Sequence, residues 1–247
     1  MNKILTLLLG LVPLGILRKI LLNLIGHKIS YSSKLGINIL LAEEIILKPK
    51  SRIGFFNFIK NKKIVLEENA FIKNLNYFKG PFDIFLGIKS GISNNNKFRR
   101  GDNRVSVGDA SLYLGKNTFI VSNHFIDLTK GVYFGNNSIL AGINSQLWTH
   151  GYYHADTGIS RARIDGDIKI GDNVYIGSGC IFNPGVTIGN AIHLGAGSVV
   201  SKDLTEPGMH VNQPLRYIDN NLDTVKSKLN RIEGHDLVEE VYEKPQK

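Results

Sequence analysis

Two histidines lie close together in the stretch NSQLWTHGYYHADTGISRARIDG, which begins at Asn144. They are His150 and His154, and Trp148, the only tryptophan of the chain, precedes them. An imidazole titrates near pH 7, so it is well suited to accept a proton from an attacking alcohol or amine. The stretch also interrupts a regular sequence repeat, and a loop on a rigid scaffold is a favoured place for catalysis. It therefore predicts a site of general base catalysis.

The repeat consists of large apolar residues at every sixth position. Neither the helical period nor the two-residue strand period gives six as its basic spacing. A six-residue repeat is typical of a parallel β-helix, in which each unit forms a short strand and a turn. The spacing predicts two runs of interior residues: Leu41, Leu47, Ile53, Ile59, Val65, Phe71 and Tyr77, and then Ile164, Ile170, Ile176, Phe182, Ile188, Leu194 and Val200.

The stretch IKIGDNVYIGSGCIFNPGVTIGNAIHLGAGSVVSKDL, residues 168–204, resembles the hexapeptide-repeat acyltransferases, in particular the branch that acetylates sugars and antibiotics. The resemblance is specific over residues 105–218. It implies an all-β fold, a left-handed parallel β-helix, and an acetyl-CoA-dependent O-acetyltransferase. It also implies a homotrimer, because members of this family hold acetyl-CoA in a groove between neighbouring chains.

The resemblance also assigns residues to roles. His150 matches the family's histidine and would act as general base on the acceptor hydroxyl. The residues that would hold the sugar acceptor are Asn123, Asp127, Trp148 and His154. The residues that would contact acetyl-CoA are Ser178, Ala196, Ser201, Lys202 and Arg216. The closing turn HVNQPLRYI departs from the family's usual pattern, in which a small-residue turn closes the β-helix.

The sequence divides into three parts. Residues 1–35 form an apolar and basic helical segment, residues 36–218 form the β-helix with loops near 94–104 and 146–163, and residues 219–247 form a C-terminal helix and tail. The apolar run of the first part is too short to span a bilayer. Residues 1–28 are therefore expected either to lie on a membrane surface or to cap the end of the β-helix, and both roles stay open. We expect a cytoplasmic protein, with peripheral contact at the inner face of the membrane left open.

Composition excludes some classes of partner. The net charge of +9 is spread along the chain and accompanies no nucleic-acid motif, so no nucleic-acid partner is expected. The charge suits attraction to a membrane or to an anionic polysaccharide. The single cysteine, Cys180, excludes an intrachain disulfide, and its place within the repeat predicts a buried side chain.

Several functions remain open. The first is O-acetylation of a sugar in a bacterial surface polysaccharide such as lipopolysaccharide or capsule, and N-acetylation of an amino-sugar nucleotide is closely related. A metal enzyme like the β-helical carbonic anhydrases would use His124, His150 and His154. The acetyl-CoA-type stretch has no role in such an enzyme, so no metal is expected. A catalytically silent structural β-helix is the last alternative.

Overall fold

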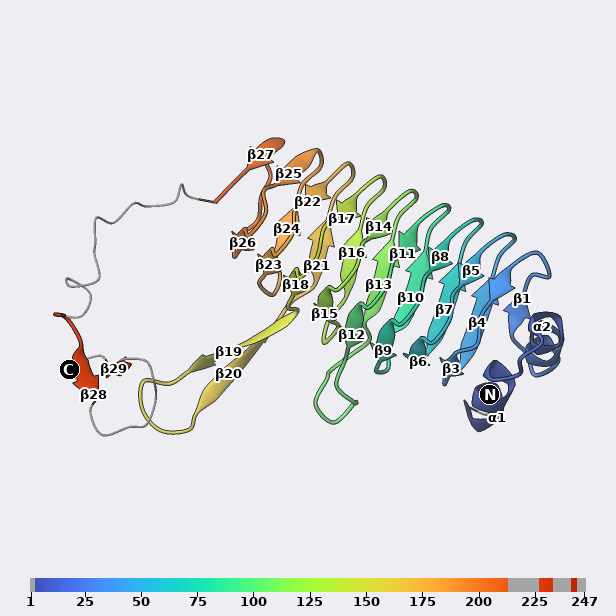
Figure 1. Cartoon of the computed structure of the whole chain (residues 1–247). Helices are drawn as coiled ribbons and strands as arrows, with labels where there is room; N and C mark the ends of the chain where they lie inside the picture. The colour runs from blue at the N-terminus through green and yellow to red at the C-terminus, as the bar shows by residue number, and fades with distance from the viewer. Residues whose placement is uncertain (1–2, 213–226, 233–240, 244–247) are drawn as a thin grey trace. The chain divides into compact units, whose positions relative to one another are not determined.

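The structure is a computed structural model that describes residues 3–212, 227–232 and 241–243. The chain divides into two compact units, residues 1–212 and residues 213–247. The first unit is a parallel β-helix in which the chain winds through three faces in turn (Figure 1). Strands of successive turns pair in parallel, so each face is a stack of short strands from distant parts of the sequence.

Each of the three faces is a continuous sheet. The first face contains β1 (Lys28–Ile29), β4 (Glu44–Leu47), β7 (Lys63–Leu66), β10 (Asp83–Leu86), β13 (Ser111–Leu114), β16 (Val132–Phe134), β21 (Ile168–Ile170) and β24 (Thr187–Ile188). The second face contains β2 (Lys34–Leu35), β5 (Arg52–Ile53), β8 (Phe71–Ile72), β11 (Gly91–Ile92), β14 (Phe119–Ile120), β17 (Ile139–Leu140), β22 (Tyr175–Ile176), β25 (Ile192–Leu194) and β27 (Gly208–His210). The third face contains β3 (Ile39–Leu40), β6 (Phe58–Lys60), β9 (Tyr77–Lys79), β12 (Lys97–Arg99), β15 (Phe125–Asp127), β18 (Gln146–Leu147), β23 (Ile181–Phe182) and β26 (Val199–Val200).

The six-residue spacing identifies the interior of the C-terminal turns. The predicted residues from Ile170 to Val200 are all buried, which confirms that part of the prediction. The exception is Ile164, which is 56% exposed because it lies in a hairpin outside the β-helix.

The spacing fails at the end of the N-terminal run. Val65, Phe71 and Tyr77 are only partly buried, and in each case the following residue is the one that fills the interior. The reason is the length of the turns: Leu47 pairs with Leu66 and Leu66 pairs with Leu86, so these turns are longer than three hexapeptides. The extra residues shift the phase by one position, and a shift of one residue reverses which side chains face inward. Leu41, at the start of the run, is also only partly buried.

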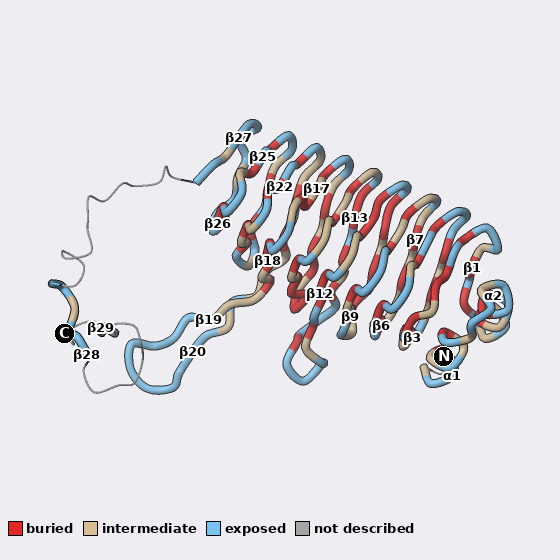
Figure 2. The backbone as a smooth tube through the Cα atoms, viewed as in Figure 1, coloured by how far each residue is buried: buried red, intermediate tan, exposed pale blue. Residues whose placement is uncertain are grey.

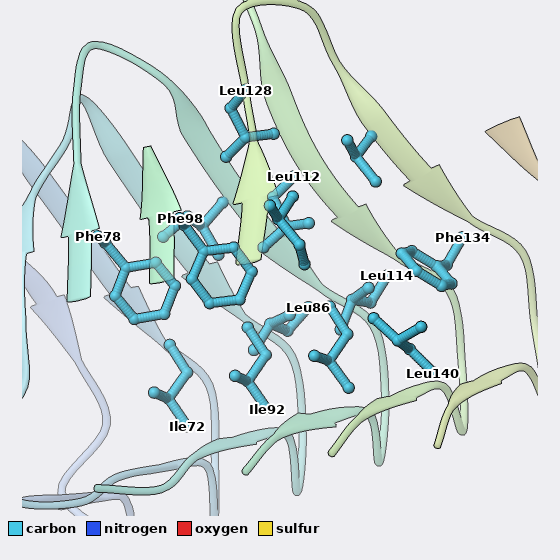
Figure 3. Packing of buried hydrophobic residues seen from close by; sticks show 14 of the residues in the cluster. Ile72, Phe78, Leu86, Ile92, Phe98, Leu112, Leu114, Leu128, Phe134 and Leu140 are labelled. Carbon is cyan, nitrogen blue, oxygen red and sulfur yellow. The ribbon is translucent and has the colours of Figure 1, made fainter. Parts of the chain in front are cut away.

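The buried residues form one apolar column that runs the length of the β-helix (Figure 2). Figure 3 shows how residues of neighbouring turns stack there, with Phe78 and Phe98 lying side by side. Their ring centroids are 4.5 Å apart and their planes are nearly parallel, at 3°. Full burial of a large apolar side chain contributes about 1.5–3 kcal/mol, so the repetition of such contacts holds the stack rigid.

A ladder of asparagines runs inside one corner of the β-helix. It consists of Asn38, Asn57, Asn76 and Asn96, all buried and each in a successive turn. The Oδ1 atom of each accepts the backbone N–H of the next, over distances of 2.8, 2.9 and 3.0 Å. The ladder satisfies backbone donors that would otherwise be buried without a partner.

His124 continues this ladder with an imidazole ring. Its backbone N–H donates to Oδ1 of Asn96 at 2.9 Å, and its Nδ1 atom accepts the backbone N–H of Ser145 at 3.1 Å. Burial lowers the pKa of His124 to about 4. The ring is therefore neutral at pH 7. Its hydrogen bond to Ser145 inside the β-helix accounts for a histidine at this position without a catalytic role.

Two short helices cover the N-terminal end of the β-helix (Figure 1). They are α1 (Lys3–Gly10) and α2 (Gly15–Leu24). Gly10 lies so close to the first turn that a Cβ atom there would be 2.9 Å from the carbonyl oxygen of Asn38. Neither helix in the described part of the chain is long and apolar enough to cross a bilayer. Of the two roles predicted for this segment, capping is therefore visible in the structure.

Two basic residues of α2 attach it to the first turn. The guanidinium of Arg18, which is 3% exposed, donates to the carbonyl oxygen of Leu35. The ammonium of Lys19 donates to the carbonyl oxygens of Tyr31 and Ser33, at 2.6 and 3.0 Å. Both cationic groups are used in hydrogen bonds within the protein. They are therefore not available to the membrane phospholipids that the sequence suggested as partners.

Two segments interrupt the β-helix. A loop at residues 100–110 connects β12 to β13, and an antiparallel hairpin of β19 (His150–His154) and β20 (Arg161–Asp165) separates β18 from β21. The loops predicted near 94–104 and 146–163 begin earlier than these segments, because Lys97–Arg99 and Gln146–Leu147 still pair as strands of the third face.

The helix and tail predicted for residues 219–247 lie in the second unit. Its described residues include the antiparallel strands β28 (Asn230–Ile232) and β29 (Val241–Glu243). Neither strand is helical, and β-branched and aromatic residue types such as those of β29 favour extended backbone. The remaining parts of the predicted helix, residues 219–226 and 233–240, lie outside the described residues.

Candidate active site

A cavity of about 880 Å³ lies on the outer side of the third face. Its wall is formed by the last residues of β6, β9, β12 and β15, by the loop at 100–110, and by the start of the β19–β20 hairpin. It contains His150, Asp127 and Trp148, three of the residues predicted to form the site. Its charged lining residues are Lys3, Lys60, Lys62, Lys79, Arg99, Arg100 and Arg163, against Glu43, Asp102 and Asp127. Cations therefore predominate.

Asp127 is a buried carboxylate at the end of β15, with a side chain 7% exposed. Its Oδ2 atom accepts the hydroxyl of Thr149 at 2.6 Å and the backbone N–H of Thr149 at 3.1 Å. Its Oδ1 atom accepts the hydroxyl of Thr129 at 3.0 Å. These three donors hold the carboxylate in one orientation and compensate the cost of burying its charge.

His150 lies against this carboxylate. Its Nδ1 atom is 2.8 Å from Oδ2 of Asp127 and 3.1 Å from the hydroxyl oxygen of Thr129. An ionised carboxylate only accepts hydrogen bonds, so Nδ1 carries the hydrogen and the neutral ring keeps its lone pair on Nε2. The side chain is 28% exposed and lines the cavity. Such a histidine can accept a proton from a bound hydroxyl, and the carboxylate stabilises the imidazolium that results.

Aromatic rings continue outward from this pair. The ring of Trp148 lies edge-on to His150 at 6.2 Å between centroids, and His150 lies edge-on to Tyr152 at 6.0 Å. Tyr152 is 48% exposed and carries the guanidinium of Arg161 over its ring at 4.7 Å. Trp148 and Tyr152 both line the cavity. Their apolar ring faces suit the packing of a sugar ring.

One arginine connects the loop to the β-helix, and another connects the hairpin to the loop. Arg100 is buried, and its guanidinium donates to the carbonyl oxygens of Leu128, Thr129 and Gly108. Arg163 donates to Asp165 at 2.8 Å and to the carbonyl oxygen of Val105 in the loop. These contacts attach the loop to the β-helix and the hairpin to the loop, and both segments line the cavity that contains the Asp127–His150 pair.

Two predicted acceptor residues lie elsewhere. Asn123 is an exposed turn residue with a φ of 61°, a conformation that asparagine tolerates well. It borders a second cavity of about 400 Å³ and not the one that contains His150. His154 lies further along β19, exposed, with its ring 6.5 Å from that of Tyr152. The structure thus brings Asp127, Trp148 and His150 together and leaves these two outside.

The residues predicted to contact acetyl-CoA lie on the C-terminal turns. The described ones, Ser178, Ala196, Ser201 and Lys202, are all exposed, and none of them lines the cavity with His150. Arg216 lies outside the described residues. The backbone of Gly177 lies close to that of Ala196 in the next turn. A Cβ atom placed on Gly177 would be 2.7 Å from the backbone nitrogen of Ala196.

The three histidines considered as metal ligands are in different surroundings. His124 is buried in the ladder, whereas His150 binds Asp127 through Nδ1. Across residues 3–212, 227–232 and 241–243, no three His, Cys, Asp or Glu side chains gather in a way that could hold a metal ion.

The sequence reasoning missed several residues of the cavity. Thr129 and Thr149 orient Asp127. Thr129 could have been found from the sequence, because it ends the stretch FIDLT that contains Asp127. Lys60, Lys79 and Arg99 were also missed, although their spacing of nineteen and twenty positions is that of the turns themselves.

Comparisons with known proteins point to one family. Residues 167–202 match the family described as "Bacterial transferase hexapeptide (six repeats)". The chain is 28% identical over 162 residues to the galactoside O-acetyltransferase of Escherichia coli (strain K12), covering 66% of each protein. It is 35% identical over 115 residues to a protein of Staphylococcus aureus (strain Mu50) whose name assigns it, provisionally, to the acetyltransferases. That match covers 44% of this chain and 56% of the relative's length.

A solved structure shows the same fold. The crystal structure of the polysialic acid O-acetyltransferase OatWY matches with a TM-score of 0.50, covering 80% of this chain and 90% of that one at 15% identity. The predicted left-handed β-helix is thereby confirmed. The sequence matches show that residues 167–202 carry the hexapeptide repeat of the bacterial transferases and that the chain is similar to the hexapeptide-repeat acetyltransferases.

Proposed function

We propose that this protein is an acetyl-CoA-dependent O-acetyltransferase that modifies a sugar hydroxyl of a bacterial surface polysaccharide. The observation that carries the proposal is the contact of 2.8 Å between Asp127 and Nδ1 of His150 at the wall of a large cavity. Similarity to a galactoside O-acetyltransferase supports a sugar as acceptor and acetyl as the transferred group. N-acetylation of an amino-sugar nucleotide is the alternative acceptor chemistry.

The chain's own residues supply the proton transfers of such a reaction. Nε2 of His150 takes the proton of the acceptor hydroxyl. At the same time the hydroxyl oxygen attacks the thioester carbonyl and forms the new C–O bond. The tetrahedral intermediate collapses as the C–S bond breaks, and the imidazolium returns its proton to the leaving thiolate. Asp127 stabilises the imidazolium between these steps. General base catalysis of this kind contributes about 10²- to 10⁴-fold in rate.

We also propose that the complete site needs a second copy of the chain, as in the homotrimer expected from the resemblance. Ser178, Ala196, Ser201 and Lys202 would hold acetyl-CoA, and none of these described residues borders the cavity with His150. Exposed apolar residues support a contact between copies, with Ile159 of the hairpin 98% and Met209 of β27 75% exposed. Acetyl-CoA held by one copy would then reach His150 of its neighbour.

Peripheral membrane association at the inner face of the cytoplasmic membrane is a further part of the proposal. Large apolar residues of the helical cap are between 46% and 69% exposed at Ile4, Leu8, Leu11, Leu14 and Ile16. An exposed apolar helical surface of this kind can lie in the boundary between headgroups and acyl chains.

Release of free thiol from acetyl-CoA in the presence of sugar acceptors tests the proposed reaction. The single cysteine does not interfere, because Cys180 is fully buried and burial raises the pKa of its thiol. We expect acceptor-dependent release that falls by about 10²-fold or more in His150→Ala. The matched control is His124→Asn, which changes a histidine outside the cavity and extends the asparagine ladder. Equal thiol release by the wild type and His150→Ala would refute His150 as the base.

A further inference from the structure

Three basic residues form a row along the wall of the cavity. Lys60, Lys79 and Arg99 are the last residues of β6, β9 and β12, and they pair directly with one another in the parallel register. In each strand the preceding residue is buried and the last one is exposed, so all three side chains leave the same side of the sheet. Adjacent strands lie about 4.8 Å apart, which makes the row about 10 Å long.

No carboxylate of residues 3–212 forms an ion pair with any member of this row. On the first face, by contrast, Glu44 lies 3.1 Å from Lys63 and 3.7 Å from Lys28. Like charges at directly opposite positions destabilise a sheet. An anionic ligand on the row would remove this repulsion.

The remaining cations of the cavity are already neutralised or used within the protein. Arg100 donates to three carbonyl oxygens. The others are held in ion pairs: Lys3 with Glu43 at 2.9 Å, Lys62 with Asp109 at 2.6 Å, and Arg163 with Asp165 at 2.8 Å. The positive charge available to a ligand is therefore concentrated in Lys60, Lys79 and Arg99.

The row leads to the candidate base. Arg99 pairs in register with Asp127, the carboxylate that holds His150. Trp148 and Tyr152 line the same cavity. A ligand that fits this surface carries several negative charges along its length and also has sugar rings that can lie against aromatic side chains.

We infer that the acceptor is an anionic glycan chain whose acidic groups bind Lys60, Lys79 and Arg99 and thereby bring a hydroxyl of the same chain to His150. This inference rests on the proposed function and names its substrate class. A sugar nucleotide is a weaker fit, because its two phosphates are directly linked and cannot follow a row that crosses three turns. A glycan with acidic groups repeated along the chain can contact all three positions.

The fluorescence of Trp148 provides a binding assay that needs no acetyl transfer, since Trp148 is the only tryptophan and lines the cavity. The probes are a decamer of galacturonic acid, its fully methyl-esterified form, and UDP-galactose. The row variant is Lys60→Gln/Lys79→Gln/Arg99→Gln. The matched control, Lys48→Gln/Lys50→Asn/Lys89→Asn, removes three exposed charges that do not line the cavity. Circular dichroism establishes that both variants are folded.

We expect the acidic decamer to bind the wild type and the control alike. The row variant should bind it about tenfold more weakly, because three exposed ion pairs are lost. The methyl ester should bind all three proteins weakly, and added salt should weaken only binding of the acid. Equal binding of the acid and its ester, equal losses in both variants, or tighter binding of UDP-galactose would each overturn the inference.

The binding assay also separates this inference from the proposed function. Selective loss of decamer binding in the row variant, together with no thiol release from acetyl-CoA for any acceptor, would refute the transferase and leave the anionic glycan site in place. The opposite result is thiol release with neutral sugars that is unchanged in the row variant, without any binding of the decamer. That result would refute the anionic glycan site and leave the transferase in place.

Discussion

The carboxylate of Asp127 and the imidazole of His150 are 2.8 Å apart, although 23 positions separate them in the sequence. The β-helix creates this contact, because Asp127 ends β15 and His150 follows the strand that stacks upon β15 in the next turn. Thr129 and Thr149 complete the arrangement from the same two turns. The contact is a property of the rigid scaffold, so changes to either residue should affect chemistry more than folding.

Replacing Asp127 by asparagine tests the orienting role of the carboxylate. The amide can still accept from Thr149, but it no longer stabilises an imidazolium at His150. We expect kcat to fall about 10²-fold or more with a small change in the KM for acetyl-CoA. Steady-state thiol release measures both constants. A large rise in KM with unchanged kcat would contradict the role and indicate acceptor binding instead.

The asparagine ladder should contribute strongly to stability. Asn76→Ala removes the Oδ1 atom that accepts both the backbone N–H and the side-chain amide of Asn96. Leaving a buried donor without a partner costs about 1–3 kcal/mol, so chemical denaturation should show a loss of at least this size. The exposed Asn103→Ala serves as control and should change the free energy of unfolding by less than about 0.5 kcal/mol. Similar losses in both would refute the ladder's importance.

Stability should fall when the pH is lowered from about 6.5 to about 4. Burial lowers the pKa values of His27 and His124 to about 4, so both rings are neutral in the folded protein. In that pH window the unfolded chain binds more protons, which favours unfolding by up to a few kcal/mol per ring, at about 1.4 kcal/mol per pKa unit. Thermal melts over this range should show a smaller decline in His124→Asn. An unchanged melting temperature down to pH 4 would contradict the assignment.

Contact between copies should depend on the hairpin. Ile159→Asp places a charge on a residue that is 98% exposed in the single chain but would be buried between copies. We expect the variant to sediment as a smaller species than the wild type and to lose thiol release. The control Lys50→Asn, at an exposed turn, should sediment like the wild type. Identical sedimentation of Ile159→Asp and the wild type would exclude the hairpin from the interface.

Membrane association should depend on the exposed apolar side of the cap. The variant Leu8→Ser/Leu14→Ser changes two residues that are 60% and 63% exposed. We expect the wild type to float with vesicles containing phosphatidylglycerol and the variant to remain at the bottom of the gradient. Phe56→Asn, which changes an equally exposed apolar residue away from the cap, should float normally. Flotation of the Leu8→Ser/Leu14→Ser variant would refute the membrane role of this surface.

The sequence allowed the fold and the centre of the site to be predicted, for different physical reasons. The interior residues from Ile170 to Val200 follow the six-residue rhythm because the last turns contain no extra residues. Earlier turns are longer, and a single added residue was enough to misplace Val65, Phe71 and Tyr77. His150 was found from its surroundings in the interrupting segment and from the family resemblance.

The remaining parts of the site depend on which turns lie side by side. Asp127 was predicted to hold the acceptor, whereas its hydrogen bonds attach it to His150, a partner that only the stacking register reveals. Asn123 has a backbone conformation that explains its residue type without any ligand. The row of Lys60, Lys79 and Arg99 became recognisable only once the turn lengths were known.

The attachment of Arg18 and Lys19 to the first turn has a consequence for how copies of the chain avoid uncontrolled association. A parallel β-helix presents unpaired strand edges at its ends, and such edges can template end-to-end growth into filaments. At the N-terminal end, the side-chain donors of these two residues occupy carbonyl oxygens of Leu35, Tyr31 and Ser33. The helical cap thereby covers part of the edge from which such growth would start.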